Sequence, residues 1–232
     1  MKKMMAITGA LLAAAAAFGA ENTLTDQEKA EGWKLLWDGA TTEGWRSMKA
    51  PDFPEKGWEI KDGEWSVIPG GGGGDIITTG VYSNFILTVD FKLAKRTNSG
   101  IKYFIDPDVH GGTAPEFQLL DHAHPDMVPE SDGVKKVGAL YSVFPAPGAE
   151  QHLKPAGEWN TLMLVCKGMS VEHWLNGTKV LAYERGSEAF RAAVATSNFK
   201  KYKGWGESEA GHIQLQDHRS KVWFRNIKLK NL

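Results

Sequence analysis

A segment near the C-terminus carries side chains suited to chemistry. From Gly211 to His218 the residues alternate as a β-strand does, with Ile213 and Leu215 on one face. The other face carries four polar side chains, those of His212, Gln214, Gln216 and His218. Amides and imidazoles exchange hydrogen bonds with hydroxyl groups, and a histidine can transfer a proton. This polar stripe fits a site for a polyhydroxylated ligand, or else an ordinary solvated strand face.

A second strand-like segment, Glu116–Asp121, repeats the pattern. Strand parity puts Glu116 and Gln118 on one face and Phe117 and Leu119 on the other. If this face and the polar stripe line the same cleft, the site contains a base, an acid and several hydrogen-bond donors. Taken alone, Glu116 fits a surface position equally well.

The next residues could bind a divalent metal, because two histidines alternate with carboxylates: Asp121, His122, His124 and Asp126. Pro125 and Pro129 indicate a loop, where such pairs also arise by chance. A divalent metal is therefore possible, and no cofactor is certain.

Composition and charge exclude several classes of protein. The chain has 232 residues and almost equal numbers of basic (27) and acidic (28) side chains. It therefore lacks the basic excess that is typical of proteins that bind nucleic acid. Cys166 is the only cysteine, which excludes an intramolecular disulfide. It follows the apolar residues 162–165 and is expected to be buried. A run of five glycines, 70–74, lacks the Lys-Ser/Thr of a phosphate-binding loop and predicts a flexible loop.

The N-terminus has the pattern of a signal peptide. Lys2 and Lys3 precede a short apolar run from Ile7 to Ala17, and small residues follow at the expected cleavage site. We therefore expect residues 1–19 to be a signal peptide, residues 20–232 to form a single domain, and the protein to be periplasmic or secreted. The apolar run is too short to span a bilayer, so no membrane anchor is expected.

Strands are expected to dominate the remaining chain. Phe85–Leu93 alternates cleanly, and Ile101, Tyr103 and Ile105 continue this pattern. Asp62-Gly63 and Asn176-Gly177 are typical of hairpin turns, and further strands are expected at 58–67, 116–120, 139–144, 159–167, 171–175 and 179–183. Helices are expected after Thr25, which begins a capping box, and from Ser187 to Ala195. This pattern predicts an all-β fold, an antiparallel β-sandwich with one or two short helices.

A series of short segments follow one another along the chain: Leu35–Gly39, Gly44–Trp45, Asn98–Ile101, Glu116–Asp121, His124–Asp126, Gly138–Tyr141, Gly157–Asn160, Glu172–Gly177, Ser197–Phe199, Leu215–His218 and Phe224–Ile227. In this order and spacing the chain resembles the 3-keto-disaccharide hydrolase domain family. The resemblance implies a concanavalin-like (lectin/glucanase) β-sandwich, or jelly roll. Two residues depart from the family pattern. Arg219 replaces a usual glycine after His218, and Ser142 replaces a common aspartate.

The resemblance implies cleavage of glycosides that carry a ketone at sugar carbon 3, so the expected partner is an oxidised oligosaccharide or glycoside. The carboxylate pair of an ordinary glucanase, Glu-x-Asp-x-x-Glu, is absent after Glu116. A 3-keto sugar does not need that pair, because the ketone acidifies the hydrogen on carbon 2. Elimination followed by addition of water then gives net hydrolysis.

On this basis Glu116 and His218 are expected to share the acid and base roles. The residues expected to bind the sugar are Gln118, Asn98, Gln214, Gln216, Arg225, Tyr103, Tyr141, Lys154 and Trp205. Two alternatives remain open. A carbohydrate-binding module would bind sugar without cleaving it, and a hydrolase of ordinary glycosides would act on unoxidised substrate.

Overall fold

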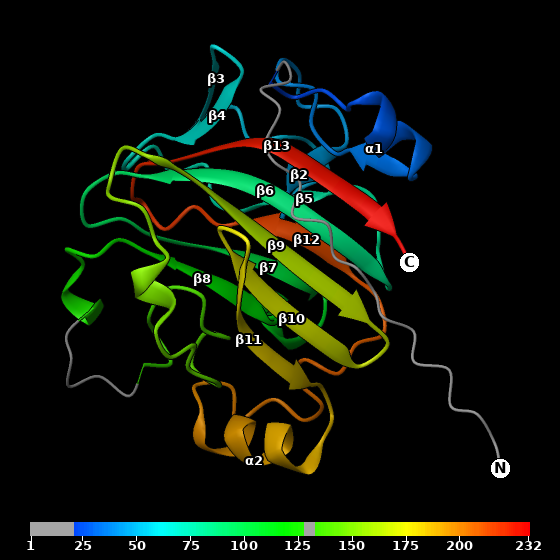
Figure 1. The fold of residues 1–232 in the computed structure, drawn as a ribbon, viewed down its shortest axis with the longest axis vertical. Coiled ribbons are helices and arrows are strands. Elements are labelled where there is room, and N and C mark those ends of the chain that lie inside the picture. Colours follow the sequence, from blue (N-terminus) through cyan, green and yellow to red (C-terminus); the bar gives the residue numbers. More distant parts are fainter. Residues whose placement is uncertain (1–20, 128–132) are drawn as a thin grey trace, which may run out of the picture.

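Two antiparallel β-sheets face one another in the computed structural model, which describes residues 21–127 and 133–232 (Figure 1). The larger sheet has eight strands. Its strands are, in spatial order, β11 (Thr178–Glu184), β10 (Ser170–Leu175), β9 (Trp159–Lys167), β6 (Phe85–Leu93), β13 (Val222–Asn231), β4 (Glu64–Val67) and β3 (Trp58–Lys61), with β1 (Trp33–Leu35) also paired to β13. The predicted antiparallel sandwich is confirmed.

The smaller sheet has five strands and positions the candidate site. Its order is β2 (Trp45–Ser47), β5 (Ile76–Thr78), β12 (His212–Leu215), β7 (Asn98–Ile105) and β8 (Glu116–Leu120). Strands β7 and β12 are far apart in the sequence, and they pair because β12 returns from the C-terminal end to fill the centre of this sheet.

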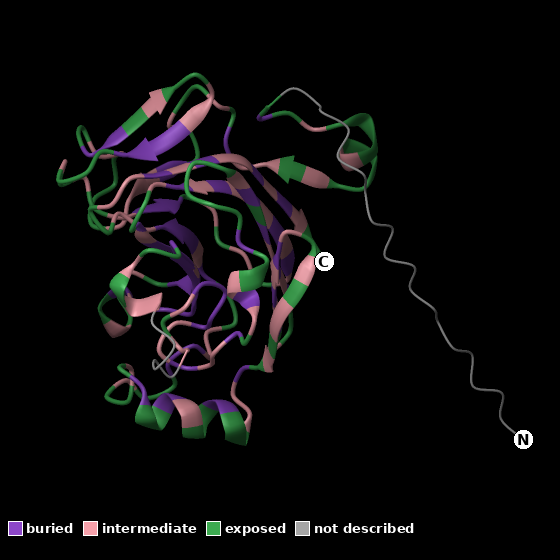
Figure 2. Ribbon diagram, turned by 60° about the vertical axis from the view of Figure 1, so that its left-hand side comes forward, coloured by how far each residue is buried: buried purple, intermediate pink, exposed green. Residues whose placement is uncertain are grey.

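Apolar side chains fill the space between the sheets. Strand β6 alternates buried and half-buried residues along its whole length, and Phe85, Val89 and Leu93 point into the core. Figure 2 shows the buried residues on the strands between the layers and exposed residues on the outer loops and on the outer side of α2. Cys166 is fully buried, as expected, and burial raises the pKa of its thiol to about 12.

The two helices begin where the sequence predicts. Helix α1 (Asp26–Ala30) has Thr25 as N-cap with a complete capping box, and α2 (Glu188–Thr196) has Ser187 as N-cap. The part of the chain that the structure describes also contains three short 3-10 helices, at His110–Gly112, Pro125–Met127 and Ala149–Gln151. Within the described ranges, no helix is long and apolar enough to cross a membrane. The predicted signal peptide lies outside the described residues.

The predicted strand at residues 139–144 is wrong. Gly138 and Ser142 both adopt positive φ, 81° and 64°, which bends the chain into turns. The strand-like pairs of this segment are two isolated bridges, Leu140 with Phe117 and Leu140 with Phe144. The resulting loop brings Tyr141 to the small sheet, where it matters for the site.

Two residues of the five-glycine run, Gly71 and Gly73, pack closely against the backbone of residues 56–57. A Cβ atom on Gly73 would lie 2.3 Å from the carbonyl oxygen of Lys56, so the two backbones approach within a distance that only glycine allows. The indole nitrogen of Trp58 donates to the carbonyl oxygen of Gly74 at 2.8 Å. The loop therefore places Asp75, which follows it, at the start of β5.

Candidate functional site

The outer face of the small sheet carries polar side chains on β7 and β8. Lys102 pairs with Glu116 across the two strands, and Gly100 pairs with Gln118. The carboxylate of Glu116 lies over Gly100, where a Cβ atom would come within 2.0 Å of its Oε1. Glycine at this position gives Glu116 the room to lie flat across the sheet.

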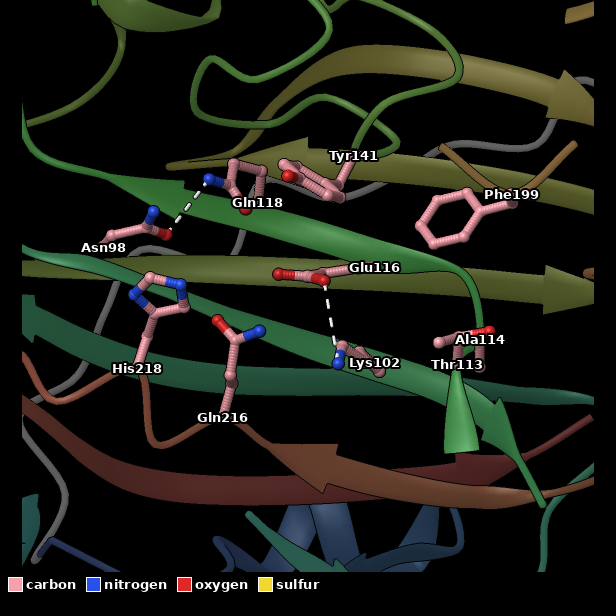
Figure 3. Close-up of a pocket in the computed structure, with 10 residues that line it drawn as sticks. All are labelled: Asn98, Lys102, Thr113, Ala114, Glu116, Gln118, Tyr141, Phe199, Gln216 and His218. Atoms are coloured by element: carbon pink, nitrogen blue, oxygen red, sulfur yellow. Dashed lines mark hydrogen bonds and ion pairs between the residues drawn. The ribbon is translucent and has the colours of Figure 1, made fainter. Parts of the chain in front are cut away.

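These residues line a cavity of about 140 Å³. Figure 3 shows Glu116 near its centre, with Gln216 and His218 reaching toward it from the end of β12 and Tyr141 lying on the opposite side. The full lining consists of Asn98, Lys102, Thr113, Ala114, Glu116, Gln118, Tyr141, Phe199, Gln216 and His218. Six of the predicted site residues therefore meet here: Glu116, His218, Asn98, Gln118, Gln216 and Tyr141.

Glu116 is the most perturbed acid of the cavity. It is only 5% exposed, and this burial raises the pKa of its carboxyl from 4.5 to about 7. The ammonium of Lys102, 4.0 Å from Oε2, acts in the opposite direction, and the charge of Asp75 adds to the increase. Near neutral pH both protonation states are populated, so Glu116 can act as a base or an acid.

The partly buried carboxylate of Asp75 holds the chain that carries His218. Asp75 Oδ1 accepts a hydrogen bond from the backbone of Asp217 at 2.9 Å, and Oδ2 accepts one from Gln214 at 2.7 Å. The backbone N–H of Gly74 donates in return to Asp217 Oδ2 at 3.0 Å. Burial raises the pKa of Asp75 above its ordinary value. These bonds join β5 to the segment after β12 and orient Gln216 and His218.

The two departures from the family pattern are accommodated. Arg219 adopts the left-handed conformation that glycine favours, with φ of 61°, and its N–H donates to Asp217 Oδ1 at 2.9 Å. Ser142 Oγ accepts a hydrogen bond from the backbone of Asn198 at 3.0 Å. This bond ties the loop of Tyr141 to the loop of Phe199, so both aromatic rings are held at the cavity.

Among the described residues, three buried amide oxygens on the site face of the small sheet lack a hydrogen-bond partner, and two of them belong to cavity-lining residues. Oε1 of Gln118, of Gln214 and of Gln216 are buried and accept no hydrogen bond from any residue that the structure describes. The amide nitrogen of Gln118 donates to Asn98 Oδ1 at 3.2 Å. Buried acceptors are normally satisfied, so these oxygens call for donors from a ligand or from ordered water.

The family model of the 3-keto-alpha-glucoside-1,2-lyase-like domain matches residues 32–230. The chain belongs to this family. A 3-keto-disaccharide hydrolase of Bacteroides thetaiotaomicron is 33% identical over 88% of this chain and 79% of its own length. A candidate glycosyl hydrolase from Parabacteroides distasonis superposes with a TM-score of 0.81 at 34% identity, covering 91% of this chain and 99% of that one. A second from the same organism gives 0.65 at 25% identity, covering 86% and 99%.

Two aromatic residues that the family resemblance placed at the sugar lie in the core instead. Tyr103 is fully buried, and its hydroxyl bonds to His173 Nε2 at 2.7 Å and to the hydroxyl of Tyr183. Its parity on β7 is that of Ile101, so it points between the sheets. Trp205 is 1% exposed and stacks on Phe199 with ring centroids 4.0 Å apart. It therefore supports a wall of the cavity rather than contacting the sugar.

Three further predicted sugar contacts lie outside the cavity lining. Arg225 is on β13 in the large sheet, where it pairs with Glu21 and lies over the ring of Trp159. Lys154 Nζ donates to the carbonyl oxygen of Trp159 at 3.0 Å. Gln214 is on the correct face but is fully buried against Asp75. Arg225 belongs to the other sheet, and Lys154 lies in a loop before β9. The residues around them in the sequence do not predict these positions.

The four metal candidates are engaged in local bonds. Asp121 Oδ2 accepts from the backbone of Arg96 and of Ala123, and His122 Nε2 bonds to the carbonyl oxygen of Leu153. His124 Nδ1 accepts from the backbone of Asp126 at 3.2 Å. In residues 21–127 and 133–232, no three His, Cys, Asp or Glu side chains are grouped to hold a metal ion. These hydrogen bonds lie in the turn that follows β8.

Four residues of the cavity lining are not predicted as site residues from the sequence: Lys102, Thr113, Ala114 and Phe199. Lys102 shares the strand parity of Asn98 and Gly100, and this signal could have placed it on the site face. Phe199 lies in a loop after α2, and no local pattern predicts its contact with a strand more than 80 positions away.

Proposed function

We propose that this protein cleaves glycosides whose sugar ring carries a ketone at carbon 3. The observation that carries the proposal is the cavity itself, where a buried glutamate with a pKa of about 7 faces a histidine among amide side chains. The similarity to a 3-keto-disaccharide hydrolase supports the same substrate class.

Glu116 acts as the base in this proposal. Its carboxylate removes the proton on carbon 2, which the neighbouring ketone acidifies, and an enolate forms. When the ketone re-forms, the bond between carbon 1 and the leaving oxygen breaks, and His218 protonates that oxygen. His218, now neutral, takes a proton from water as the water oxygen bonds to carbon 1 of the unsaturated ketone, and Glu116 returns its proton to carbon 2. The net reaction is hydrolysis, with no change in oxidation state.

The amide groups bind the sugar. The amide groups of Gln118 and Gln216, which line the cavity, exchange hydrogen bonds with ring hydroxyls, and Asn98 supplies a further amide group at the same edge of the cavity. Tyr141 and Phe199, with ring centroids 6.3 Å apart, form the aromatic side of the cavity and pack against the ring.

A 3-keto-glucoside with a chromogenic leaving group tests the proposal. The wild-type protein is expected to release the leaving group, and Glu116→Gln and His218→Ala are each expected to lose about 100-fold or more in kcat. Because Glu116 must be ionised, kcat/KM is expected to rise as the pH passes about 7. The matched controls Glu43→Gln and His152→Ala change exposed side chains and retain wild-type activity.

Three outcomes would contradict the proposal. Full activity in both Glu116→Gln and His218→Ala would show that the assigned residues are wrong. Binding of the 3-keto sugar without release of the leaving group would favour the carbohydrate-binding module. Equal activity on the unoxidised glycoside would favour an ordinary glycoside hydrolase.

We also propose that the enzyme acts after export, in the periplasm or outside the cell. The support is the basic and apolar pattern of residues 1–19. Mass spectrometry of the protein from its native host is expected to show a mature N-terminus at residue 20 or 21. A chain that retains Met1–Gly19 would contradict export by this route.

A further inference from the structure

Lys102 lies beside Glu116 on the face of the small sheet that lines the cavity, and the mechanism above gives it no role. It lies on β7, with Glu116 beside it on β8 and Gln214 beside it on β12. Its side chain is 14% exposed and lines the cavity, and its Nζ atom is 4.0 Å from Glu116 Oε2 (Figure 3). A lysine held this far from water next to a cavity carries a strong local positive charge.

We propose that Lys102 is a catalytic residue whose ammonium group stabilises the enolate that forms at carbon 3 of the sugar. This inference rests on the proposed function. It deepens that function by assigning the electrophile that enolate formation requires.

The spacing of the two groups fits the reacting atoms. In a ketone, the carbonyl oxygen and the adjacent carbon that loses its proton lie about 2.4 Å apart, from ordinary C–C and C=O bond lengths. A carboxylate oxygen and an ammonium 4.0 Å apart can therefore face both atoms at once. Glu116 then reaches the hydrogen on carbon 2, and Lys102 donates a hydrogen bond to the oxygen on carbon 3.

The step balances in atoms and charge. The Glu116 carboxylate takes the proton from carbon 2, and the electron pair of that C–H bond becomes the second bond between carbons 2 and 3. The π electrons of the carbonyl move onto the oxygen, whose negative charge faces the ammonium of Lys102. Lys102 keeps its proton, so it is positive before and after the step.

The competing explanation is that Lys102 only pairs with Glu116. In that role the ammonium keeps the pKa of Glu116 lower than burial alone would make it. Removing Lys102 would then raise the pH at which activity appears. With a leaving group that needs no proton from His218, sufficiently alkaline solution would restore the full rate. An electrophilic role predicts a reduced rate even after Glu116 is fully ionised.

The pH dependence of kcat therefore separates the two explanations, provided that the substrate carries an activated leaving group that departs as its anion, because the alkaline rate then depends on Glu116 and not on proton donation by His218. Lys102→Met is expected to lower the alkaline plateau of kcat about 100- to 1000-fold, the cost of removing a group that stabilises an oxyanion. Lys102→Arg keeps the charge and is expected to retain more activity than Lys102→Met. The control Lys179→Met removes a lysine that pairs with Glu172 at 3.0 Å on the large sheet and does not line the cavity, and it is expected to retain the wild-type rate.

Specific results overturn the inference. A Lys102→Met plateau within about threefold of wild type shows that the lysine only tunes Glu116. If Lys102→Met does not fold, as judged by circular dichroism, Lys102→Gln takes the same measurement and the same threshold. A wild-type protein that leaves 3-keto-glucosides intact overturns the proposed function and this inference together. If the wild type is active and the kcat plateau of Lys102→Met equals that of the wild type, this inference alone is overturned.

Discussion

Replacing Glu116 by glutamine is expected to stabilise the folded protein in alkaline solution and to change its stability little in acid. Each unit of pKa corresponds to about 1.4 kcal/mol, so the increase from 4.5 to about 7 corresponds to about 3 kcal/mol. The folded state holds the proton more tightly than the unfolded chain does. The free energy of unfolding is therefore highest below pH 4.5, falls as the pH rises toward 7, and carries the full penalty above it.

Glutamine has nearly the same shape as protonated glutamate and does not ionise. In acid, both proteins leave Lys102 without a charged partner at this position, so their free energies of unfolding are expected to agree. By pH 8.5 the wild type contains a buried carboxylate, and the variant is expected to be more stable by about 3 kcal/mol. The gap between the two proteins thus isolates the titration of one side chain from all others.

Urea unfolding of both proteins at pH 4.5, 6, 7 and 8.5 measures this gap. The variant Glu43→Gln, an exposed carboxylate, is the control and is expected to track the wild type at every pH. A gap that stays constant within about 0.5 kcal/mol across this range would refute the reasoning, since the burial of Glu116 would then have no effect on its ionisation. A stability gap that grows toward acidic pH would show that the pKa of Glu116 is lowered on folding rather than raised.

Two further substitutions test the placement of single residues. Tyr103→Phe removes the hydroxyl that lies 2.7 Å from His173 Nε2, so urea unfolding is expected to show a loss of about 1–3 kcal/mol, with unchanged KM for a 3-keto-glucoside. A raised KM at unchanged stability would instead place Tyr103 at the sugar. Arg219→Gly removes the strain of a left-handed conformation in the folded state, and it also raises the conformational entropy of the unfolded chain. The two effects change the free energy of unfolding in opposite directions by about 1 kcal/mol each. The stability and activity of Arg219→Gly are therefore expected to stay close to those of the wild type. Arg219→Val is expected to lower the melting temperature. Equal melting temperatures for Arg219→Val and the wild type would argue against a strained turn.

Local patterns in the sequence predicted the elements well. The hairpin turns at Asp62-Gly63 and Asn176-Gly177 were predicted from residue pairs that tolerate positive φ, and all four residues adopt it. The N-caps of α1 and α2 were predicted from side chains that bond within three residues. These features were predictable because the interactions that decide them are close in the sequence.

The site was predictable only in part. Strand parity and the family resemblance brought Glu116, Gln118 and Asn98 to one face, and the cavity confirms that they meet. The same parity places Tyr103 with Ile101 in the core, against its expected role as a sugar contact. The error at Arg225 has a different origin. Its strand belongs to the opposite sheet, and strand order cannot be derived from alternation.

The polar stripe at residues 212–218 shows which features of the site follow from the sequence and which depend on the tertiary structure. Alternation determined that Ile213 and Leu215 face the core and that Gln214 and Gln216 face away from it, since a side chain's face depends on its own strand alone. Only the tertiary structure decided that Gln216 and His218 meet Glu116, because hydrogen bonds to Asp75, more than 140 positions away, hold that segment. Only packing raised the pKa of Glu116, because burial is a property of the assembled sheet and loops rather than of any one strand.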